Sequence, residues 1–319
     1  MLKYVTHSET AMQRLIGRFA AACREFGLTI SLKKTEVMCQ DVSTAPSISI
    51  GDHTLEVVEN FKYLGSTISN NLSLDPELNC RIGKATTAMA RLTKRVWENG
   101  MLTINTKMKV YQACVLSTLL YGSEAWTLYA HQERRLSTFH LRCLRRLLGL
   151  TWQDHITDID VLAKAGMASM HSILTTRHLR WLGHVSRMED SRIPKNLLFG
   201  ELASGSRSTG RPSLRFKDVC KRDLKAGGFN LAELGTATSD RQKWRATIRQ
   251  VTNAAEERRN ACWEEKRAGK KHSESDPPQT AFRYSTCGRS CGSRIGLHSH
   301  TRRCNPSTQQ DNIHGATQP

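Results

Sequence analysis

Two stretches decide the expected fold of this chain: Phe26-Gly27-Leu28-Thr29-Ile30-Ser31-Leu32-Lys33-Lys34-Thr35 and, after a gap, Phe61-Lys62-Tyr63-Leu64-Gly65-Ser66. The first closes a helical pattern over 8–26 at Gly27, because glycine readily adopts the left-handed conformation that ends a helix. It then alternates apolar and polar residues over 28–32, which predicts a strand. The second belongs to a series of short predicted strands over 48–50, 55–58 and 61–68. We therefore expect residues 1–70 to form a small α+β region.

From residue 75 onward the pattern is helical, so the chain is expected to be mainly α. Residues 81–97 have one apolar face, and the opposite, basic face carries Arg81, Lys84, Arg91, Lys94 and Arg95. Residues 106–121 are apolar nearly all round, which predicts a buried helix, and 131–148 predict an amphipathic helix with Arg142, Arg145 and Arg146 outward. These three helices are expected to form one bundle over 71–150.

The remaining segments predict a basic helical region and a small terminal module. Helices are expected over 158–165, 169–188, 214–226 and 240–268, with an exposed Gly/Ser-rich loop over 204–212. The predicted boundaries are a basic helical linker region at 151–268, a flexible linker at 269–281, a module at 282–304 and a disordered tail at 305–319.

Composition points to a polyanionic partner. Lys and Arg outnumber Asp and Glu by 47 to 29, which gives a net charge of +18. A surface this basic attracts nucleic acid, although an inert basic protein and a membrane-surface binder remain alternatives. The chain has no run of about 18 apolar residues, so no membrane span is expected. It has no secretory signal either, so we expect an intracellular protein, nuclear or cytoplasmic.

The cysteines and aromatic residues of the helical region are expected to be structural. Seven of the ten cysteines, among them Cys114 and Cys143, stand singly in apolar helical stretches and are predicted to be small core hydrophobes. Trp126 and Trp181 are likewise expected in the core. His184 is expected to be a satisfied structural histidine, with a phosphate contact as the alternative.

Together the two opening stretches resemble the end of the palm and the start of the thumb in reverse transcriptases of non-LTR retrotransposons. Stretches at 119–126, 142–146 and 180–184 follow in the order of that family. In the family, an aromatic-Ala-Asp-Asp turn with two catalytic aspartates lies about one helix upstream. Here the first aspartate is Asp41 and no Asp-Asp pair occurs. The resemblance therefore implies no catalytic residue in this chain, and Mg²⁺ is not expected to bind.

The resemblance also implies roles for nucleic-acid-binding residues. Lys33 and Lys34 would lie beside the bound nucleotide, where a lysine can balance phosphate charge, and Phe61, Tyr63 and Gly65 would form the primer-grip hairpin. Without metal-binding carboxylates, a solvated basic turn describes what these lysines can do here. For the hairpin, an ordinary structural role is as good a reading of the residues alone as a primer grip. The basic face at 81–97 would follow a duplex backbone. The loop residues Arg207 and Arg211, with Arg215 after them, could lie along phosphates.

The terminal module has the spacing of a zinc finger. Twelve residues separate Cys287 from His300, and three separate His300 from Cys304, as in the second half of a Cys-Cys-His-Cys finger. The family finger has a cysteine three positions before the first of these, where this chain has Tyr284. We predict one zinc ion held by Cys287, Cys291, His300 and Cys304. His298 is the alternative fourth ligand, and a decayed site without metal is the alternative to zinc binding.

We interpret the chain as a fragment of a non-LTR retrotransposon reverse transcriptase that keeps nucleic-acid-binding parts and lacks the catalytic aspartates. The expected partners are RNA, DNA or both, and possibly a separate palm-containing chain, with no membrane and no small-molecule substrate. Two alternatives stay open: a truncated gene model of an active reverse transcriptase, and an unfolded pseudogene product.

Overall fold

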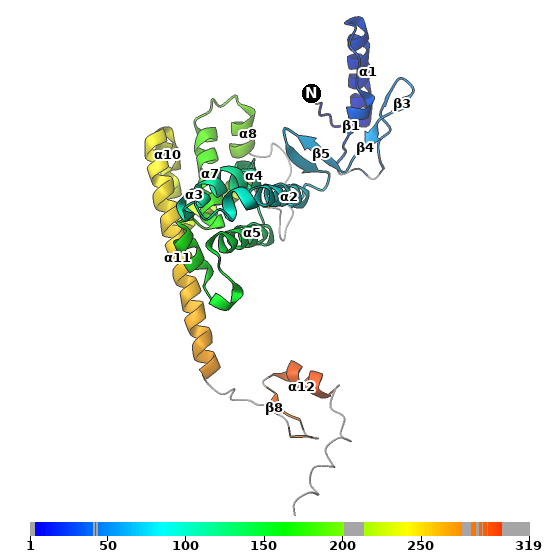
Figure 1. Cartoon of the computed structure of the whole chain (residues 1–319). Helices are drawn as coiled ribbons and strands as arrows, with labels where there is room; N and C mark the ends of the chain where they lie inside the picture. The colour runs from blue at the N-terminus through cyan, green and yellow to red at the C-terminus, as the bar shows by residue number, and fades with distance from the viewer. Residues whose placement is uncertain are drawn as a thin grey trace, which may run out of the picture. The chain divides into compact units, whose positions relative to one another are not determined.

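The protein is mainly helical with a few two-stranded sheets, which confirms the predicted fold class (Figure 1). The computed structural model describes residues 4–40, 42, 44–200, 214–275, 282–284, 287–288, 290–291 and 293–301. The chain consists of two compact units, which comprise residues 1–256 and residues 257–319. None of the described helices is long and apolar enough to cross a membrane.

The N-terminal region is a small α+β structure. Its elements are α1 (Glu9–Glu25), β1 (Glu36–Val37), β2 (Ser49–Ile50), β3 (His53–Thr54), β4 (Glu56–Val57), β5 (Asn60–Tyr63) and β6 (Ser66–Ser69). Ile16, Val37, Ile48 and Leu55 form its apolar core. Gln13 of α1 closes the edge of β2, because its side-chain amide donates to Ser49 O and accepts from Ser49 N, both at 2.9 Å.

The predicted strand at 28–32 is wrong. Residues 28–31 are irregular, and a 3₁₀ turn follows at Leu32–Lys34. Leu28 is 62% exposed, so the apolar positions of the pattern do not all face a core. Alternation alone does not make a strand, because a strand also needs a partner for its backbone groups. Gly27 does end α1 as predicted, with a φ of 66°.

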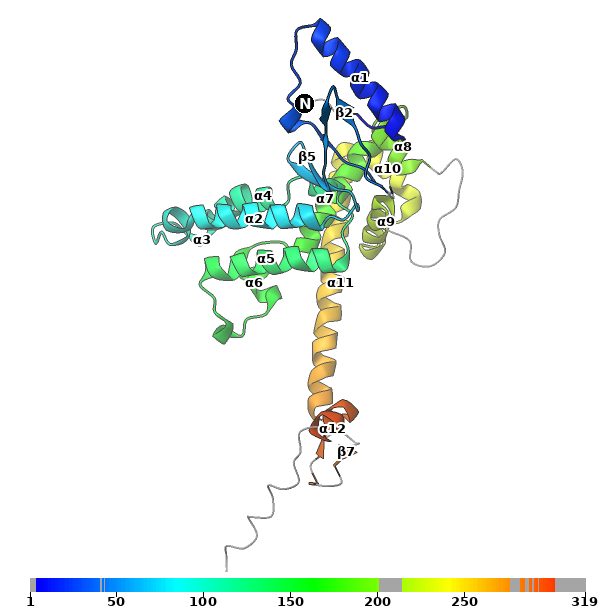
Figure 2. The same ribbon diagram turned by 90° about the vertical axis from the view of Figure 1, so that its right-hand side faces the viewer.

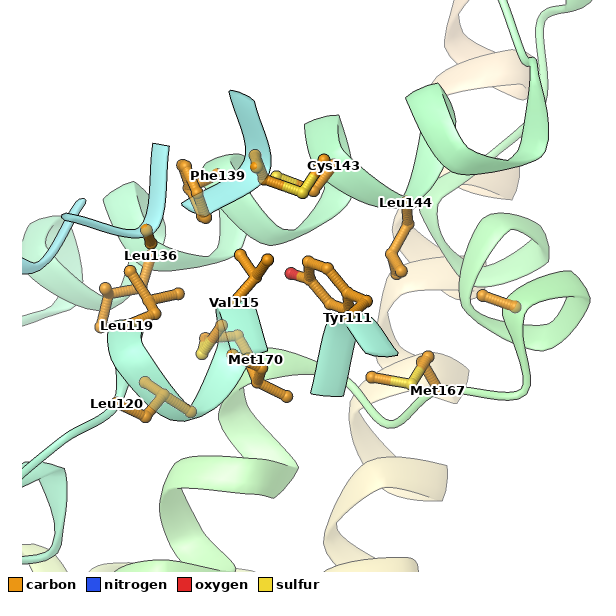
Figure 3. Packing of buried hydrophobic residues seen from close by; sticks show 14 of the residues in the cluster. Tyr111, Val115, Leu119, Leu120, Leu136, Phe139, Cys143, Leu144, Met167 and Met170 are labelled. Carbon is orange, nitrogen blue, oxygen red and sulfur yellow. The ribbon is translucent and has the colours of Figure 1, made fainter. Parts of the chain in front are cut away.

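A helical bundle follows and confirms the three helical segments expected between residues 81 and 148. Its elements are α2 (Asp75–Arg91), a π-helical turn (Thr93–Trp97), α3 (Ile104–Val110), a second π-helical turn (Tyr111–Leu116), α4 (Ser117–Leu119), α5 (Ala130–Leu148) and α6 (Asp158–Ala165). Tyr111, Val115, Leu136 and Leu144 pack in its centre (Figure 3). The same cluster includes Met167, Met170 and Leu174, so the packed core continues past the predicted boundary at residue 150.

The helical segment at 106–121 is buried on one side only, which corrects the expectation of a helix buried all round. Gln112, Ala113 and Cys114 are exposed, whereas Tyr111 and Val115 are fully buried. Cys114 is therefore not a core residue, although Cys143 is, as predicted. Lys109 and Gln112 mark the exposed side, but the exposed Ala113 and Cys114 are residue types that are also common in cores, so residue type alone did not distinguish the two sides.

A buried polar pair lies inside this bundle. Tyr111 Oη is 2.8 Å from His140 Nδ1, and His140 Nε2 is 3.3 Å from the carbonyl oxygen of Ala168. Both side chains are fully buried, and burial lowers the pKa of His140 to about 4 and raises that of Tyr111. His140 is thus neutral, with Nε2–H donating to Ala168 and Nδ1 accepting from Tyr111.

A second apolar cluster joins α7 (Met170–Ser186) to α9 (Phe216–Ala226), α10 (Leu234–Ser239) and the first part of α11 (Arg241–Ser275), with α8 (Ile193–Phe199) beside it. Trp244 of α11 lies against α7, where its indole nitrogen donates to Leu179 O at 2.9 Å. A Cβ atom at Gly183 would lie 2.1 Å from Trp244 Nε1, so only glycine fits here. Trp126 is buried as predicted, whereas Trp181 is half-buried and His184 is exposed.

The unit at 257–319 contains the second part of α11, then β7 (Phe282–Arg283), β8 (Ser290–Cys291) and α12 (Arg294–Thr301). The strands pair antiparallel, so the module has the β-β-α order of a zinc finger. α11 continues to Ser275, which corrects the flexible linker predicted from residue 269. Lysine and glutamate favour helix even without an apolar face, and three of the seven residues at 269–275 are of these two types.

Candidate nucleic-acid interface

The β5–β6 hairpin is closed by a two-residue turn. Tyr63 pairs with Ser66, and between them Leu64 and Gly65 have φ values of 47° and 85°. Positive φ at both central residues is typical of a type I′ turn, whose twist matches that of the strands. Leu64 is 72% exposed and Tyr63 is 42% exposed. Of the predicted primer-grip residues, Tyr63 and Gly65 therefore lie at the tip of a regular hairpin, whereas Phe61 lies further along β5 and pairs with Ile68.

A buried ion pair on α2 holds this hairpin in place. Glu77 Oε2 accepts from the backbone nitrogen of Thr67 at 2.6 Å, and Arg81 Nη2 donates to the carbonyl oxygen of Gly65 at 2.6 Å. Glu77 and Arg81 also pair with each other at 2.7 Å, and both are almost completely buried. Tyr121 Oη donates to Leu64 O at 3.0 Å, and the Arg81 guanidinium lies over the Tyr121 ring. Both carbonyl oxygens of the turn thus have partners within the protein.

Arg81 is therefore not on the solvent-facing side of α2, which corrects its predicted position. It is 5% exposed, because the hairpin turn at Gly65 and the Tyr121 ring lie against its guanidinium. The Glu77–Arg81 spacing of four residues was a signal for a helical ion pair, but such pairs are usually exposed and the sequence did not show that a hairpin would cover this one.

The other four predicted residues of this segment are exposed: Lys84, Arg91, Lys94 and Arg95. We call these four the basic face. Lys84 and Arg91 are seven residues apart and lie on one side of α2. Lys94 and Arg95 follow in the π-helical turn, which is anchored where Trp97 Nε1 donates to Met89 O at 2.7 Å. Lys107 Nζ donates to Trp97 O at 2.8 Å and fixes the end of the same turn.

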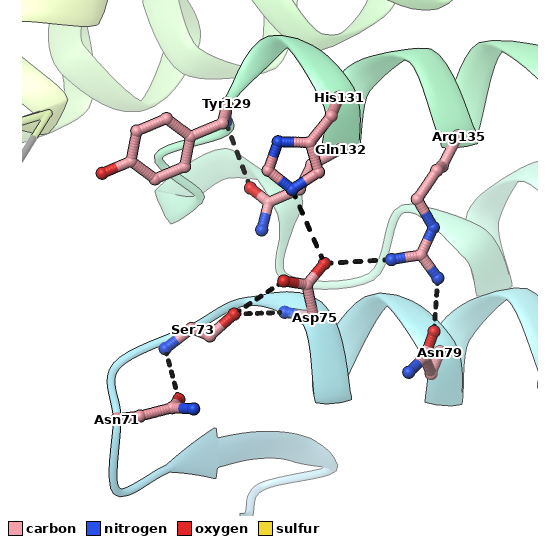
Figure 4. Close-up of polar contacts among 8 residues, drawn as sticks. All are labelled: Asn71, Ser73, Asp75, Asn79, Tyr129, His131, Gln132 and Arg135. Atoms are coloured by element: carbon pink, nitrogen blue, oxygen red, sulfur yellow. Dashed lines mark hydrogen bonds and ion pairs between the residues drawn. The ribbon is translucent and has the colours of Figure 1, made fainter.

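α5 lies beside α2 and runs in the same direction (Figures 1 and 2). At one end, Arg135 Nη1 donates to Asp75 Oδ1 at 2.9 Å, and Arg135 Nη2 donates to Asn79 Oδ1 (Figure 4). A hydrogen bond from Ser73, together with the nearby Arg135, keeps the pKa of Asp75 below its usual value. At the other end, Arg146 Nη2 donates to Thr93 Oγ1 at 3.3 Å.

This arrangement adds two residues that the sequence interpretation placed outward but did not assign to the interface. Arg142 and Arg146 are exposed on α5, and the bond from Arg146 to Thr93 places Arg146 beside the π-helical turn of the basic face. Their spacing of four residues puts them on one side of α5. This spacing was visible in the sequence. It indicates a shared interface with the basic face only when α5 is known to lie alongside α2.

The remaining predicted contacts are dispersed. Lys33 and Lys34 are exposed on the 3₁₀ turn of the N-terminal region. Arg215 precedes α9 and forms two hydrogen bonds with Asp218, at 2.8 and 3.1 Å, which raise the pKa of its guanidinium. Arg207 and Arg211, with the loop that carries them, lie outside the described residues.

The terminal module brings two of the four predicted zinc ligands together. Cys287 Sγ lies 3.0 Å from His300 Nε2, and the Tyr284 ring packs edge-on against His300 with centroids 5.2 Å apart. Zinc bonds of about 2.3 Å to sulfur and about 2.0 Å to nitrogen can be made by a pair this close after a small outward shift. Cys291 lies in β8 opposite Phe282, and Cys304 is outside the described residues. Among the described side chains, no three His, Cys, Asp or Glu residues converge as a metal-ligand group.

The sequence of this chain is similar to those of proteins from mobile elements. A transposon-derived protein of Caenorhabditis elegans is 27% identical over 259 residues, which cover 77% of this chain and 91% of that protein. Two proteins of Drosophila melanogaster also match: the RNA-directed DNA polymerase from mobile element jockey is 20% identical over 50% of this chain, and an RNA-directed DNA polymerase from transposon BS is 26% identical over 43%.

The matched segments span 18% and 16% of the two Drosophila polymerases, so this chain corresponds to a small part of each. No family model matches the chain, and no solved structure matches it. The three matches agree with the resemblance carried by residues 26–35 and 61–66. The chain is a relative of the reverse transcriptases of non-LTR retrotransposons.

Proposed function

We propose that this chain binds RNA or DNA through phosphate contacts along the bundle formed by α2 and α5. The observation that carries this proposal is the basic face, Lys84, Arg91, Lys94 and Arg95, which lies on an exposed side of the bundle and is linked through Thr93 to Arg146. Phosphate contacts of this kind bind a nucleic-acid backbone with little dependence on sequence.

The charges of the basic face are not used inside the protein. Within the described part of the chain, none of its four residues forms an ion pair, whereas Arg81, Arg135 and Arg215 each have a carboxylate partner. An uncompensated cation at the surface is available to replace the counterions of a phosphate, which is the main source of sequence-independent affinity. The net charge of +18 adds a long-range attraction for the same ligand.

We propose further that the chain contributes binding and not nucleotide addition. The support is the sequence: no Asp-Asp pair occurs in it, and polymerases of the resembled family hold their metal ions on such a pair. The purified chain should not extend a primer on an RNA template. Template-dependent incorporation of labelled nucleotide above a control without protein would overturn this part of the proposal.

The binding proposal is tested with charge-matched variants. Lys84→Gln/Arg91→Gln removes two charges from the basic face, and Arg245→Gln/Arg249→Gln removes two exposed charges from α11. Binding of a labelled duplex should weaken in the first variant, with the slope of log affinity against log salt reduced by about 1.8, because each lost phosphate contact accounts for roughly 0.9. The second variant should retain the wild-type slope. Equal slopes in the two variants would contradict the proposal.

A second proposal concerns the terminal module, where the closeness of Cys287 Sγ and His300 Nε2 supports zinc binding. Cys304 would be a third ligand by its spacing from His300, and Cys291 would complete the site after a shift from β8, with His298 as the alternative. Bound zinc would tie β8 to α12 in a module with little apolar core, so metal binding would supply much of its folding free energy.

A further inference from the structure

A cleft along α5 combines three kinds of chemical group. Its volume is about 460 Å³. It is lined by Thr138, Leu141, Arg142, Arg146, Leu150 and the ion pair Arg145–Asp158, and we call it the α5 cleft. Leu141 and Leu150 are half-buried and form an apolar wall, while Arg142 and Arg146 are exposed at its edge. The cleft thus has an apolar wall, two cations and one carboxylate.

The cations of the α5 cleft are not equivalent. Arg145 Nη2 donates to Asp158 Oδ1 at 2.7 Å and to Ile156 O at 3.2 Å, so its charge is compensated. Arg142 and Arg146 have no carboxylate partner among the described residues, and Arg146 makes only the bond to Thr93. Side chains four apart on a helix have Cβ atoms about 5–6 Å apart, so both guanidinium groups can reach one phosphate group.

We infer that the α5 cleft holds one nucleotide unit of a bound strand, with its phosphate on Arg142 and Arg146 and its sugar or base against Leu141 and Leu150. This inference deepens the proposed function and rests on it. A nucleotide supplies a group for each part of the cleft: an anion for the two arginines, a flat or ring-shaped surface for the leucines, and a hydroxyl or amino donor for the Asp158 carboxylate.

Asp158 distinguishes this ligand from other polyanions. The Asp158 carboxylate repels the side-chain carboxylates of an acidic peptide, whose backbone amides are the only hydrogen-bond donors that it offers there. A nucleotide tolerates the same carboxylate, because its ribose hydroxyls and base amino groups are hydrogen-bond donors that Asp158 can accept from. Guanidinium groups also stack on the bases of a nucleotide, and an acidic peptide has no such flat ring to stack on. The acidic peptide is therefore the competing ligand for the experiment.

The experiment measures binding of labelled oligouridylate to the full-length chain at several salt concentrations. Arg142→Gln/Arg146→Gln should lose affinity, with the salt slope reduced by about 0.7, because the two arginines share one phosphate and each phosphate contact to a single strand accounts for roughly 0.7. Arg142→Gln alone, which leaves Arg146 on the same phosphate and the Arg146–Thr93 bond intact, should lose less affinity than the double variant. Arg245→Gln/Arg249→Gln is the control with matched charge and spacing and should keep the wild-type slope.

Three results would overturn the inference. The first is a cleft double variant that binds oligouridylate as the α11 control does, which would leave the proposed function standing if the wild type binds. The second is that the cleft double variant loses more affinity for labelled oligoglutamate than for oligouridylate, which would assign the cleft to an acidic peptide. The third is wild-type protein that binds no nucleic acid, in which case the proposed function fails as well. Circular dichroism of each variant confirms that the helices are intact.

Discussion

The Arg81 side chain of α2 donates a 2.6 Å hydrogen bond to the carbonyl oxygen of Gly65 at the tip of the β5–β6 hairpin. These residues are sixteen positions apart in the sequence, and the bond joins the α+β region to the helical bundle. Glu77 pairs with the same guanidinium and accepts a hydrogen bond from the backbone nitrogen of Thr67 in β6. One buried ion pair therefore holds both the turn and β6. The hairpin is thereby a fixed part of the bundle surface.

Removing Arg81 should detach the hairpin and destabilise the protein. Arg81→Gln leaves Glu77 buried without its partner, and breaking a buried pair in this way costs on the order of 3–5 kcal/mol. Lys84→Gln, one turn further along the same helix and exposed, should change the unfolding free energy by less than about 0.5 kcal/mol. Urea unfolding followed by circular dichroism compares the two. Similar midpoints for the two variants would show that the Arg81 contacts are not important for stability.

Two glycines should respond oppositely to alanine. At Gly183 the new Cβ would lie 2.1 Å from Trp244 Nε1, so Gly183→Ala should displace the indole and cost about 1–3 kcal/mol, as overpacking of a core does. At Gly83 of α2 no heavy atom lies within 4 Å of the new Cβ, so Gly83→Ala should stabilise the helix by about 0.5–1 kcal/mol. Thermal unfolding measures both shifts. A neutral Gly183→Ala would contradict the close packing of α7 on α11.

Acid should destabilise the bundle through His140. Its pKa is about 4 in the folded protein because it is buried, whereas an unfolded histidine titrates near 6.5. The unfolded chain therefore binds more protons between these values, so stability is fully present above pH 6.5 and falls as the pH is lowered toward 4. Well below pH 4, the free energy of unfolding is lower by on the order of 3 kcal/mol because of this residue.

Unfolding midpoints measured from pH 7 to pH 4.5 test this prediction. The pH dependence should be smaller in His140→Gln but not absent, because burial also lowers the pKa of His178. His184→Gln removes an exposed histidine and should keep the wild-type dependence. A wild-type midpoint that does not change over this range would contradict the buried, neutral state of His140.

Zinc binding by the terminal module should depend on Cys287 and His300. The purified chain should carry one zinc ion per molecule by elemental analysis, and Cys287→Ser and His300→Gln should each lose it, because they provide adjacent ligands. Cys262→Ser is the control, since Cys262 is an exposed cysteine of α11 in the same unit. Cys291→Ser with full zinc content would favour His298 as the fourth ligand. Zinc-free wild-type protein would indicate a decayed site.

Elements with their own periodicity were predictable from the sequence. The helix at 131–148 is α5 to within a residue, and Leu136, Phe139, Cys143 and Leu147 are buried as their spacing predicted. Glycine after a helical pattern correctly indicated the end of α1 at Gly27. In these cases the information lies within a few turns of chain, so no distant contact was needed to interpret it.

Features that depend on distant contacts were not predictable in this way. Arg81 belongs by periodicity to an exposed face, and only the hairpin at Gly65 buries it. The residues 28–32 alternate as a strand does but are not one in the structure. The α5 cleft needs Leu150 and Asp158 to return beside α5, which follows from the turn at Gly149 and the pairing of Asp158 with Arg145. Periodicity along one element carries no information on what another element covers.

The salt dependence of nucleic-acid binding by the unaltered chain is the most direct test of whether its basic helices bind phosphates. A labelled duplex and a labelled single strand are each titrated with protein at low and at high salt. If the basic face and the α5 arginines contact several phosphates, log affinity falls linearly with log salt, by roughly 0.9 per contact for the duplex. We expect a slope equivalent to several phosphate contacts. Affinity that does not change with salt, or no binding at low salt, would contradict it.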